Sequence, residues 1–311
     1  MAVERGSIVE FAVSGIDPNI LNPFIHTAGV KLFHQYFEIT QKPANLEYLK
    51  EILFHFSKLP YENLSKIISH SEETDMIRKL RLPLEVMEGY ISHKLGGTCF
   101  SLTFFLYCIL VHAGYSCYPV MADMKWAQNS HCVLILLYDG SKYLVDPGYL
   151  FNQPMELHPQ KPRIYDSDFS GIELAYREEL NTYEVYTFNR TEMKWRYRFQ
   201  DRPCPLEEFL RFWVSSFYWN SMHGLCLTRA ERGRLIYVHK YFMRESTYEG
   251  KANYNIKKDY HQKIYEAFGI EPVIVERALS ALAINMARER ELGLWTPSKK
   301  DSLKIKEKYE N

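Results

Sequence analysis

The 311-residue sequence has no excess of charge of either sign, because 38 Lys and Arg residues balance 38 Asp and Glu residues. This balance argues against a nucleic-acid partner and against binding to a membrane surface. The sequence also has no apolar run long enough to span a bilayer, since the longest covers only residues 100–111. Charges at Glu4, Arg5 and Glu10 do not fit the pattern of a signal peptide. These absences predict a cytoplasmic protein that binds neither membranes nor nucleic acids.

Motifs for metal and nucleotide binding are missing as well. No two of the six cysteines form a C-x-x-C pair, and no His/Cys cluster has the spacing of zinc ligands. The sequence has no Gly-rich phosphate loop of the P-loop or dinucleotide type. We therefore expect free thiols in a reducing compartment, no metal and no tightly bound cofactor. The cysteines are Cys99, Cys108, Cys117, Cys132, Cys204 and Cys226.

What the sequence does contain is a change of pattern along the chain. Its hydrophobic fraction of 46% and charged fraction of 24% are ordinary for a globular protein with a sizeable core. Helical periodicity dominates the first third, for example after the N-capping Asn45 and in the apolar run that ends at Gly114. Strand-like segments follow, and the last part mixes both patterns. Because helices and strands are segregated rather than alternating, the order predicts an α+β fold.

Two strand-like segments flank Asp139-Gly140, which is a strong signal for a β-hairpin. Paired residues in this hairpin are expected to have numbers that sum to about 279. His131 is expected to open the first strand, 132–138, and Asp146 then lies diagonal to it on the same face, close enough for the two side chains to meet. A carboxylate in that place can fix the tautomer of an imidazole.

The stretch Gly96-Gly97-Thr98-Cys99 precedes an apolar helical run. Two glycines let the backbone approach a reacting carbonyl closely. A helix that begins at Cys99 directs the positive end of its dipole at the sulfur and favours the thiolate. If this helix packs against the hairpin, His131 can deprotonate Cys99 while Asp146 orients the ring. The three residues predict a nucleophilic triad and an enzyme that works by covalent catalysis.

Each of these residues also has a purely structural interpretation. A free cysteine in an apolar helix is usually a small core residue, which is how we interpret Cys108, Cys132 and Cys226. A lone histidine such as His131 beside a strand is more often structural, and Asp146 before Pro-Gly is most often a turn former. Only the combination, on a helix start and a hairpin, favours the catalytic interpretation.

These segments resemble the active-site segments of the arylamine N-acetyltransferase family. The likeness lies in Gly96-Gly97-Thr98-Cys99, in His131, in Val145-Asp146-Pro147-Gly148-Tyr149 and in the 15-residue spacing from His131 to Asp146. Leu59-Pro60-Tyr61-Glu62-Asn63-Leu64 resembles the family's segment upstream of the cysteine. Leu225-Cys226-Leu227-Thr228-Arg229 resembles one of its C-terminal strands. The same thiol, imidazole and carboxylate core occurs in transglutaminases and cysteine proteases.

The resemblance implies a fold in three parts. A helical bundle over residues 1–115 carries the nucleophile, and a β-barrel-like part over 116–222 carries the histidine and the aspartate. An α/β lid over 223–311 closes over the site and ends in a helix and a polar tail from Lys299.

The resemblance also implies a reaction. The cysteine takes acetyl from acetyl-coenzyme A, which acts as a co-substrate, and passes it to an arylamine, a hydrazine or an N-hydroxyarylamine in a ping-pong mechanism. Tyr61 and Tyr149 match pocket-lining aromatics of the family and are expected to bind substrate. Phe217 is a further aromatic that could line the same cavity. Each of the three could instead be a core residue.

The sequence departs from the family pattern around the triad. Leu95 stands where the family usually has an arginine that is expected to pair with the upstream glutamate, so Glu62 needs another partner, such as Lys94, or stays exposed. Ser101 and Thr103 occupy places where the family usually has Glu or Gln and Asn. These departures leave open an amide synthase or a thiol hydrolase that uses another acyl thioester. They also leave open a non-catalytic binding protein on the same scaffold.

Overall fold

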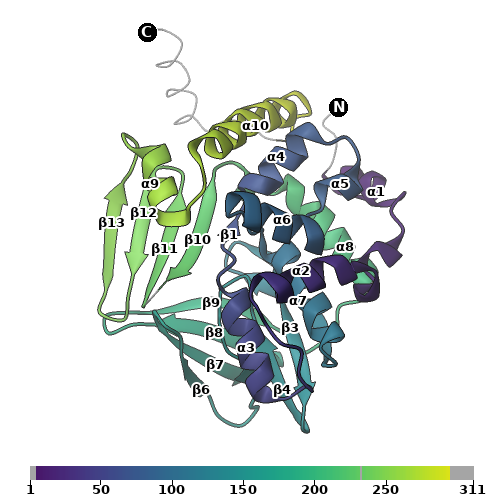
Figure 1. Ribbon diagram of the computed structural model, residues 1–311, viewed down its shortest axis with the longest axis vertical. Coiled ribbons are helices and arrows are strands. Elements are labelled where there is room, and N and C mark those ends of the chain that lie inside the picture. Colours follow the sequence, from purple (N-terminus) through teal and green to yellow (C-terminus); the bar gives the residue numbers. More distant parts are fainter. Residues whose placement is uncertain (1–4, 232, 295–311) are drawn as a thin grey trace.

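The computed structural model describes residues 5–231 and 233–294, which form a helical region, a curved sheet of eight strands and a second sheet of five strands (Figure 1). The prediction of an α+β fold is confirmed, because helices and antiparallel strands are segregated along the chain. The boundaries expected at residues 115 and 222 stay a prediction, and the polar tail from Lys299 lies outside the described residues.

The helical region occupies most of the first 112 residues. Its helices are α1 (Arg5–Val13), η1 (Pro18–Leu21), η2 (Pro23–His26), α2 (Thr27–Tyr36), α3 (Leu46–Phe56), α4 (Leu64–Glu72), α5 (Met76–Lys79), α6 (Pro83–His93) and α7 (Cys99–His112). The Asn45 side chain accepts a hydrogen bond from the backbone N–H of Tyr48 and caps α3, as the sequence predicts. α7 is apolar on nearly every side and is buried at the centre of this region.

The eight-stranded sheet is antiparallel throughout and curves into a nearly closed barrel. Its strands are β2 (Ser116–Met124), β3 (Ala127–Tyr138), β4 (Ser141–Val145), β5 (Met155–Glu156), β6 (Arg163–Asp166), β7 (Gly171–Arg177), β8 (Thr182–Phe188) and β9 (Met193–Phe199), with the short helix η3 (Glu178–Leu180) between β7 and β8. In space they follow the order β5-β4-β3-β2-β9-β8-β7-β6.

The hairpin that joins β3 to β4 has the predicted turn and register. Asp139 and Gly140 both have positive φ, at 49° and 76°, which the tight hairpin turn requires. Leu134 pairs with Val145, as expected from the turn. The predicted strand start is wrong, however, because β3 begins at Ala127, and His131 lies within the strand, paired with Ala122 of β2.

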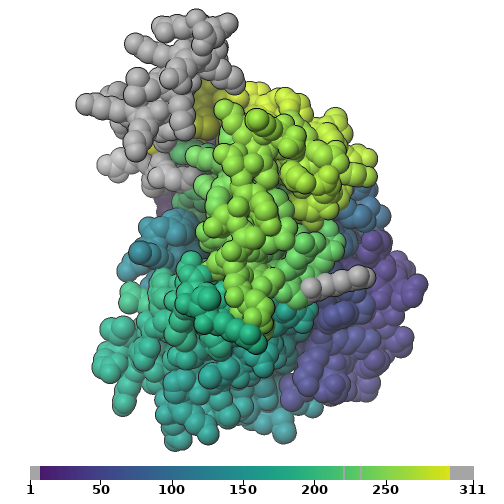
Figure 2. Space-filling model, turned by 90° about the vertical axis from the view of Figure 1, so that its left-hand side faces the viewer, coloured from purple at the N-terminus to yellow at the C-terminus, as the bar shows by residue number. Residues whose placement is uncertain are grey.

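The C-terminal part adds three helices, two short 3-10 helices and the second sheet. These elements are α8 (Leu206–Ser215), η4 (Ser216–Tyr218), η5 (Asn220–Met222), β10 (Cys226–Glu231), β11 (Arg234–His239), β12 (Phe242–Ser246), β13 (Lys251–Asn255), α9 (Tyr260–Phe268) and α10 (Pro272–Glu291). The sheet also takes in β1 (Tyr61–Glu62) from the helical region, which pairs with β10. Figure 2 shows this sheet and α9, in green, meeting the barrel, in teal, along a seam.

Packing on β3 brings the helical region and the barrel together. Cys132 and Leu134 of β3 belong to the core that contains α7, whereas the alternating Val133 and Ile135 belong to the core inside the barrel. Because α7 lies against one face of β3, its first residue comes close to the hairpin. Within residues 5–231 and 233–294, no helix is both long and apolar enough to cross a bilayer.

Candidate active site

Cys99, His131 and Asp146 come together at the start of α7. Nε2 of His131 lies 3.0 Å from Oδ2 of Asp146. The backbone N–H of Tyr149 donates to the other carboxylate oxygen at 3.0 Å. Because Nε2 faces Asp146, Nδ1 is the ring nitrogen left for the Cys99 thiol, with which His131 forms a hydrogen bond. The geometry is that of a nucleophile, a base and a group that orients the base.

A cavity of about 850 Å³ gives access to this arrangement. It lies between the barrel and the five-stranded sheet, and both Cys99 and His131 line it. Cys99 is 7% exposed and His131 3%, while Asp146 is fully buried behind them. A small molecule in the cavity can therefore reach the sulfur, and the carboxylate is shielded from water.

The electrostatics of the site favour a thiolate. A hydrogen bond from the Cys132 thiol, with the hydrogen bond and charge of His131, lowers the pKa of Cys99 well below its ordinary value in spite of burial. Burial opposes a charge on His131, but the charge and hydrogen bond of Asp146 outweigh it and raise the pKa of His131 to about 10. At neutral pH the two groups therefore form a thiolate and imidazolium pair.

The N-terminus of α7 supports the same state. Thr98 is the N-cap of α7, and its side chain makes no capping hydrogen bond. The first turn of α7, which the structure describes in full, contains no acidic residue. The backbone N–H groups of that turn are thus left without side-chain acceptors. The helix dipole stabilises a thiolate at Cys99, and the same N–H groups can hold an oxyanion that forms on a carbonyl attacked by the sulfur.

Gly148 and Gly96 lie where the backbone packs closely against neighbouring residues around the site. A Cβ atom on Gly148 would lie 2.8 Å from Cε1 of His131 and 3.1 Å from Cβ of Cys99. A Cβ atom on Gly96 would overlap the carbonyl oxygen of Pro60. Gly96 therefore serves the packing of one backbone segment on another, whereas the sequence suggested an approach to a reacting carbonyl.

Cys132 is a core residue, as the sequence predicts, but it also contacts the nucleophile, which the sequence did not indicate. Cys132 is fully buried, and its thiol donates to Cys99. The Thr103 hydroxyl donates to the Cys132 backbone carbonyl at 3.1 Å and thereby ties α7 to β3. The available signal was the position of Cys132 next to His131, which became informative only once α7 was known to lie on that face.

Glu62 does not pair with Lys94, the partner that the sequence suggested. Glu62 is fully buried and accepts hydrogen bonds from the backbone N–H and the hydroxyl of Ser65, at 2.9 and 2.5 Å. Lys94 instead donates to the Tyr36 hydroxyl at 3.4 Å. Both expectations, pairing with Lys94 and exposure to solvent, are therefore wrong. The cation near Glu62 is Arg81, whose pKa is lowered by burial against the opposing charge of Glu62.

The predicted substrate-binding aromatics do not all reach the cavity. Tyr61 and Tyr149 line it, and the Tyr149 ring packs edge-on against His131 with 5.3 Å between centroids. Phe217 is 1% exposed, belongs to the helical core and is not among the residues that line the cavity. Trp219, two residues later, does line it.

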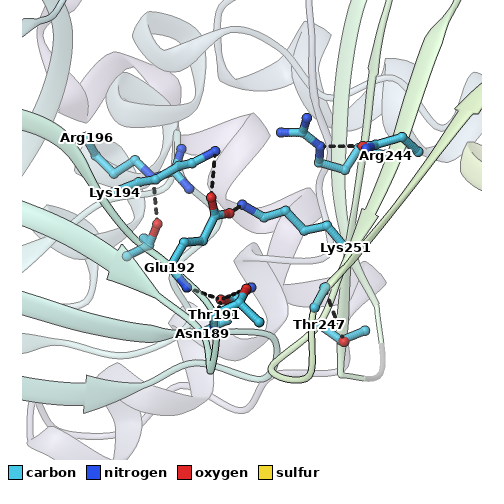
Figure 3. Close-up of polar contacts among 11 residues, drawn as sticks. Asn189, Thr191, Glu192, Lys194, Arg196, Arg244, Thr247 and Lys251 are labelled. Atoms are coloured by element: carbon cyan, nitrogen blue, oxygen red, sulfur yellow. Dashed lines mark hydrogen bonds and ion pairs between the residues drawn. The ribbon is translucent and has the colours of Figure 1, made fainter.

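Basic side chains also line the cavity, and no sequence pattern marks them as part of the site. Lys66 lies near Cys99. A further group of basic side chains lies where the barrel faces the five-stranded sheet (Figure 3), and we call this part of the cavity its mouth. Glu192 bridges this mouth, since it pairs with Lys251 of β13 and lies 3.3 Å from Lys194 of β9. The basic residues of the cavity wall are Lys66, Lys194, Arg196, Arg244 and Lys251. Across the described ranges, no cluster of His, Cys, Asp and Glu could hold a metal ion.

The chain is similar to known proteins in sequence and in fold. A family model described as N-acetyltransferase matches residues 45–275, well over half of the chain. Arylamine N-acetyltransferase from Mycobacterium abscessus has a similar structure, with a TM-score of 0.66 and 14% identity over 82% of this chain and 94% of that one. Arylamine N-acetyltransferase C from Bacillus anthracis gives a TM-score of 0.61 and 22% identity over 78% and 98%. The enzyme from Salmonella typhimurium gives 0.64 and 13% over 81% and 98%. No curated protein sequence matches the chain.

Proposed function

This chain belongs to the arylamine N-acetyltransferase family and is an acyltransferase, and we propose that it carries an acetyl group from acetyl-coenzyme A to an arylamine or a similar amine through Cys99. The observation that carries the proposal is the buried contact of 3.0 Å between His131 and Asp146, beside a cysteine that opens a helix and faces a cavity.

In the first half of the reaction, the Cys99 thiolate attacks the thioester carbonyl. The backbone N–H groups at the start of α7 stabilise the oxyanion. The bond between the carbonyl carbon and the coenzyme A sulfur then breaks, and the leaving sulfur takes the proton of the His131 imidazolium. The products are coenzyme A and an acetyl-Cys99 thioester, with His131 now neutral.

In the second half, the amine attacks the acetyl carbonyl. Nδ1 of His131 accepts the proton that the amine loses, and Cys99 leaves as a thiolate. The amide is released and the thiolate and imidazolium pair is restored. Asp146 keeps the ring in one orientation through both halves. Tyr61 and Tyr149, on the cavity wall, are proposed to contact the acceptor ring.

Intact-protein mass spectrometry after exposure to acetyl-coenzyme A tests this function. We expect a mass gain of one acetyl group in the wild type and in Cys117→Ala, a control cysteine of β2, but none in Cys99→Ala. Acetylation of Cys99→Ala to the wild-type extent would contradict the mechanism. If only larger acyl thioesters acylate Cys99, the amide synthase or hydrolase interpretation replaces acetyl transfer. The cytoplasmic location stays a prediction.

A further inference from the structure

Lys66 of α4 is a buried cation beside the nucleophile. It is 6% exposed, lines the cavity with Cys99, and its charge contributes to the low pKa of that thiol. Its ammonium group donates to the Ser216 hydroxyl and lies 4.4 Å from the centre of the Phe217 ring. In the described part of the chain, no carboxylate forms an ion pair with it. Lys66 is therefore held in place by neutral groups only.

A buried ammonium group without an anion is unfavourable, because neutral hydrogen-bond partners replace only part of its hydration. The structure shows the effect, since burial lowers the pKa of Lys66 to about 7. The charge of the Cys99 thiolate compensates Lys66 only in part, because burial outweighs it and the hydrogen-bonded cation of that thiolate is His131. An anion that enters the cavity would remove the unfavourable term.

The two ends of the cavity can serve different anions. Arg196 and Arg244 lie at the mouth and donate to the neutral side chains of Thr187 and Asn253, at 2.6 and 2.8 Å (Figure 3). Such half-buried guanidinium groups without a carboxylate partner suit phosphates. Lys66 is a basic residue of the cavity wall whose charge acts on Cys99, where the transferred acyl group and the attacking amine must meet.

On the basis of the function proposed above, we propose that Lys66 is the counter-ion for a carboxylate carried by one of the two substrates. The carboxylate sits either at the far end of the acyl group, as in a coenzyme A monothioester of a dicarboxylic acid, or on the acceptor, as in an aminobenzoate. Both sources supply the same chemistry to the same ammonium group, which forms an ion pair with it at the side of Cys99.

Matched substrate pairs separate the two sources. Succinyl-coenzyme A is compared with butyryl-coenzyme A as donor, and 4-aminobenzoate with 4-aminobenzamide as acceptor, by kcat/KM. We expect the wild type to prefer the charged member of one pair, and Lys66→Met to lose this preference roughly tenfold or more. Lys66→Arg should keep it. Lys79→Met, which removes a partly buried lysine outside the cavity wall, should leave both ratios unchanged.

Ratios are the decisive readout, because a general effect of Lys66 on the thiolate or on folding would slow both members of a pair equally. Unchanged ratios in Lys66→Met, or no preference in the wild type, would overturn the proposal. Calorimetric titration with 4-aminobenzoate and 4-aminobenzamide, without any donor, tests the site separately from turnover. If no thioester acylates the protein but Lys66→Met loses a preference for 4-aminobenzoate, the carboxylate site stands and acyl transfer fails.

Discussion

The two ends of the cavity differ in how their charges are compensated. At the Cys99 end, His131 is bonded to Asp146, and Asp146 is bonded to the backbone of Tyr149. At the mouth, Arg196 and Arg244 bond to neutral side chains within the described structure. The reacting groups are therefore fixed by internal partners before any substrate arrives. Elsewhere on the cavity wall, Lys66, Arg196 and Arg244 have no carboxylate partner in the described structure and keep positive charge for the molecules that enter.

The largest effect on activity should come from removing the negative charge that Asp146 places beside His131. Asp146→Asn removes the charge that raises the pKa of His131 and stabilises the wrong tautomer of the ring, so we expect kcat/KM for acetyl transfer to fall by about 10³–10⁴-fold. Steady-state rates with acetyl-coenzyme A measure this, with Asp201→Asn as the control because Asp201 pairs with Lys142 away from the cavity. A loss of less than tenfold would contradict the role of Asp146.

Shape can be disturbed without changing any charge. Gly148→Ala places a methyl group against His131 and Cys99, and a displacement of the reacting groups by about 1 Å costs on the order of a hundredfold in rate. Gly250→Ala is the matched control, because a Cβ atom there meets nothing within 4 Å. Equal activity of the two variants would show that the close packing around Gly148 is irrelevant to catalysis.

The positive charge of Lys66 is only partly compensated, and the free-energy cost of burying this charge should lower the stability of the protein. Its pKa falls from 10.5 to about 7 on folding, so the unfolded chain binds more protons between these values. The contribution of Lys66 to stability therefore improves as pH rises through this range and is least favourable below pH 7. We expect Lys66→Met to be more stable than the wild type below pH 7, on the order of a few kcal/mol.

Denaturant unfolding of both proteins across this range measures the difference. The advantage of Lys66→Met should shrink as the pH approaches 10.5. Parallel pH profiles of the two proteins would mean that Lys66 is not destabilised by burial.

The smallest effect is expected at the mouth. Glu192→Gln removes the carboxylate that pairs with Lys251 and Lys194 and leaves more positive charge there. We expect KM for acetyl-coenzyme A to fall by no more than about threefold at low salt and the effect to vanish at high salt, since partly exposed charges are screened. Glu249→Gln, which removes the partner of Arg190 outside the cavity wall, should have no effect. A loss of affinity in Glu192→Gln would show that this bridge itself forms the binding site.

Local signals explain how much of the site could be predicted. The hairpin register followed from Asp139-Gly140, because a two-residue turn fixes which residues pair. The position of Cys99 followed from the apolar run behind it, which had to be a helix. The start of β3 could not be predicted, because residues 128–130 are polar and become a strand only through pairing with β2.

Contacts between distant segments escaped prediction. Arg81 takes the place near Glu62 that the sequence suggested for Lys94. It precedes α6 in the chain, and its guanidinium group donates to the Gly96 carbonyl at 3.1 Å. Lys66 looks like an ordinary polar residue of an amphipathic helix until its neighbours from η4 are known. Long-range proximity of this kind is a property of tertiary structure and leaves no periodic trace in the sequence.

The strand β1 limits where the chain can be cut or exchanged, because it joins the N-terminal region to the C-terminal sheet. Tyr61 of β1 pairs with Thr228 of β10 and also forms a β-bridge with Gly97. The short strand β1 thus connects the loop that precedes Cys99 to the edge of the C-terminal sheet. The side-chain carbonyl oxygen of Asn63 also accepts a hydrogen bond from the backbone N–H of Cys226 at 2.8 Å. A chimera that exchanges everything after residue 222 with a relative would have to reproduce this seam. Otherwise, the cavity beside Cys99 would lose the side that the C-terminal sheet forms, even though all three residues of the triad are still present.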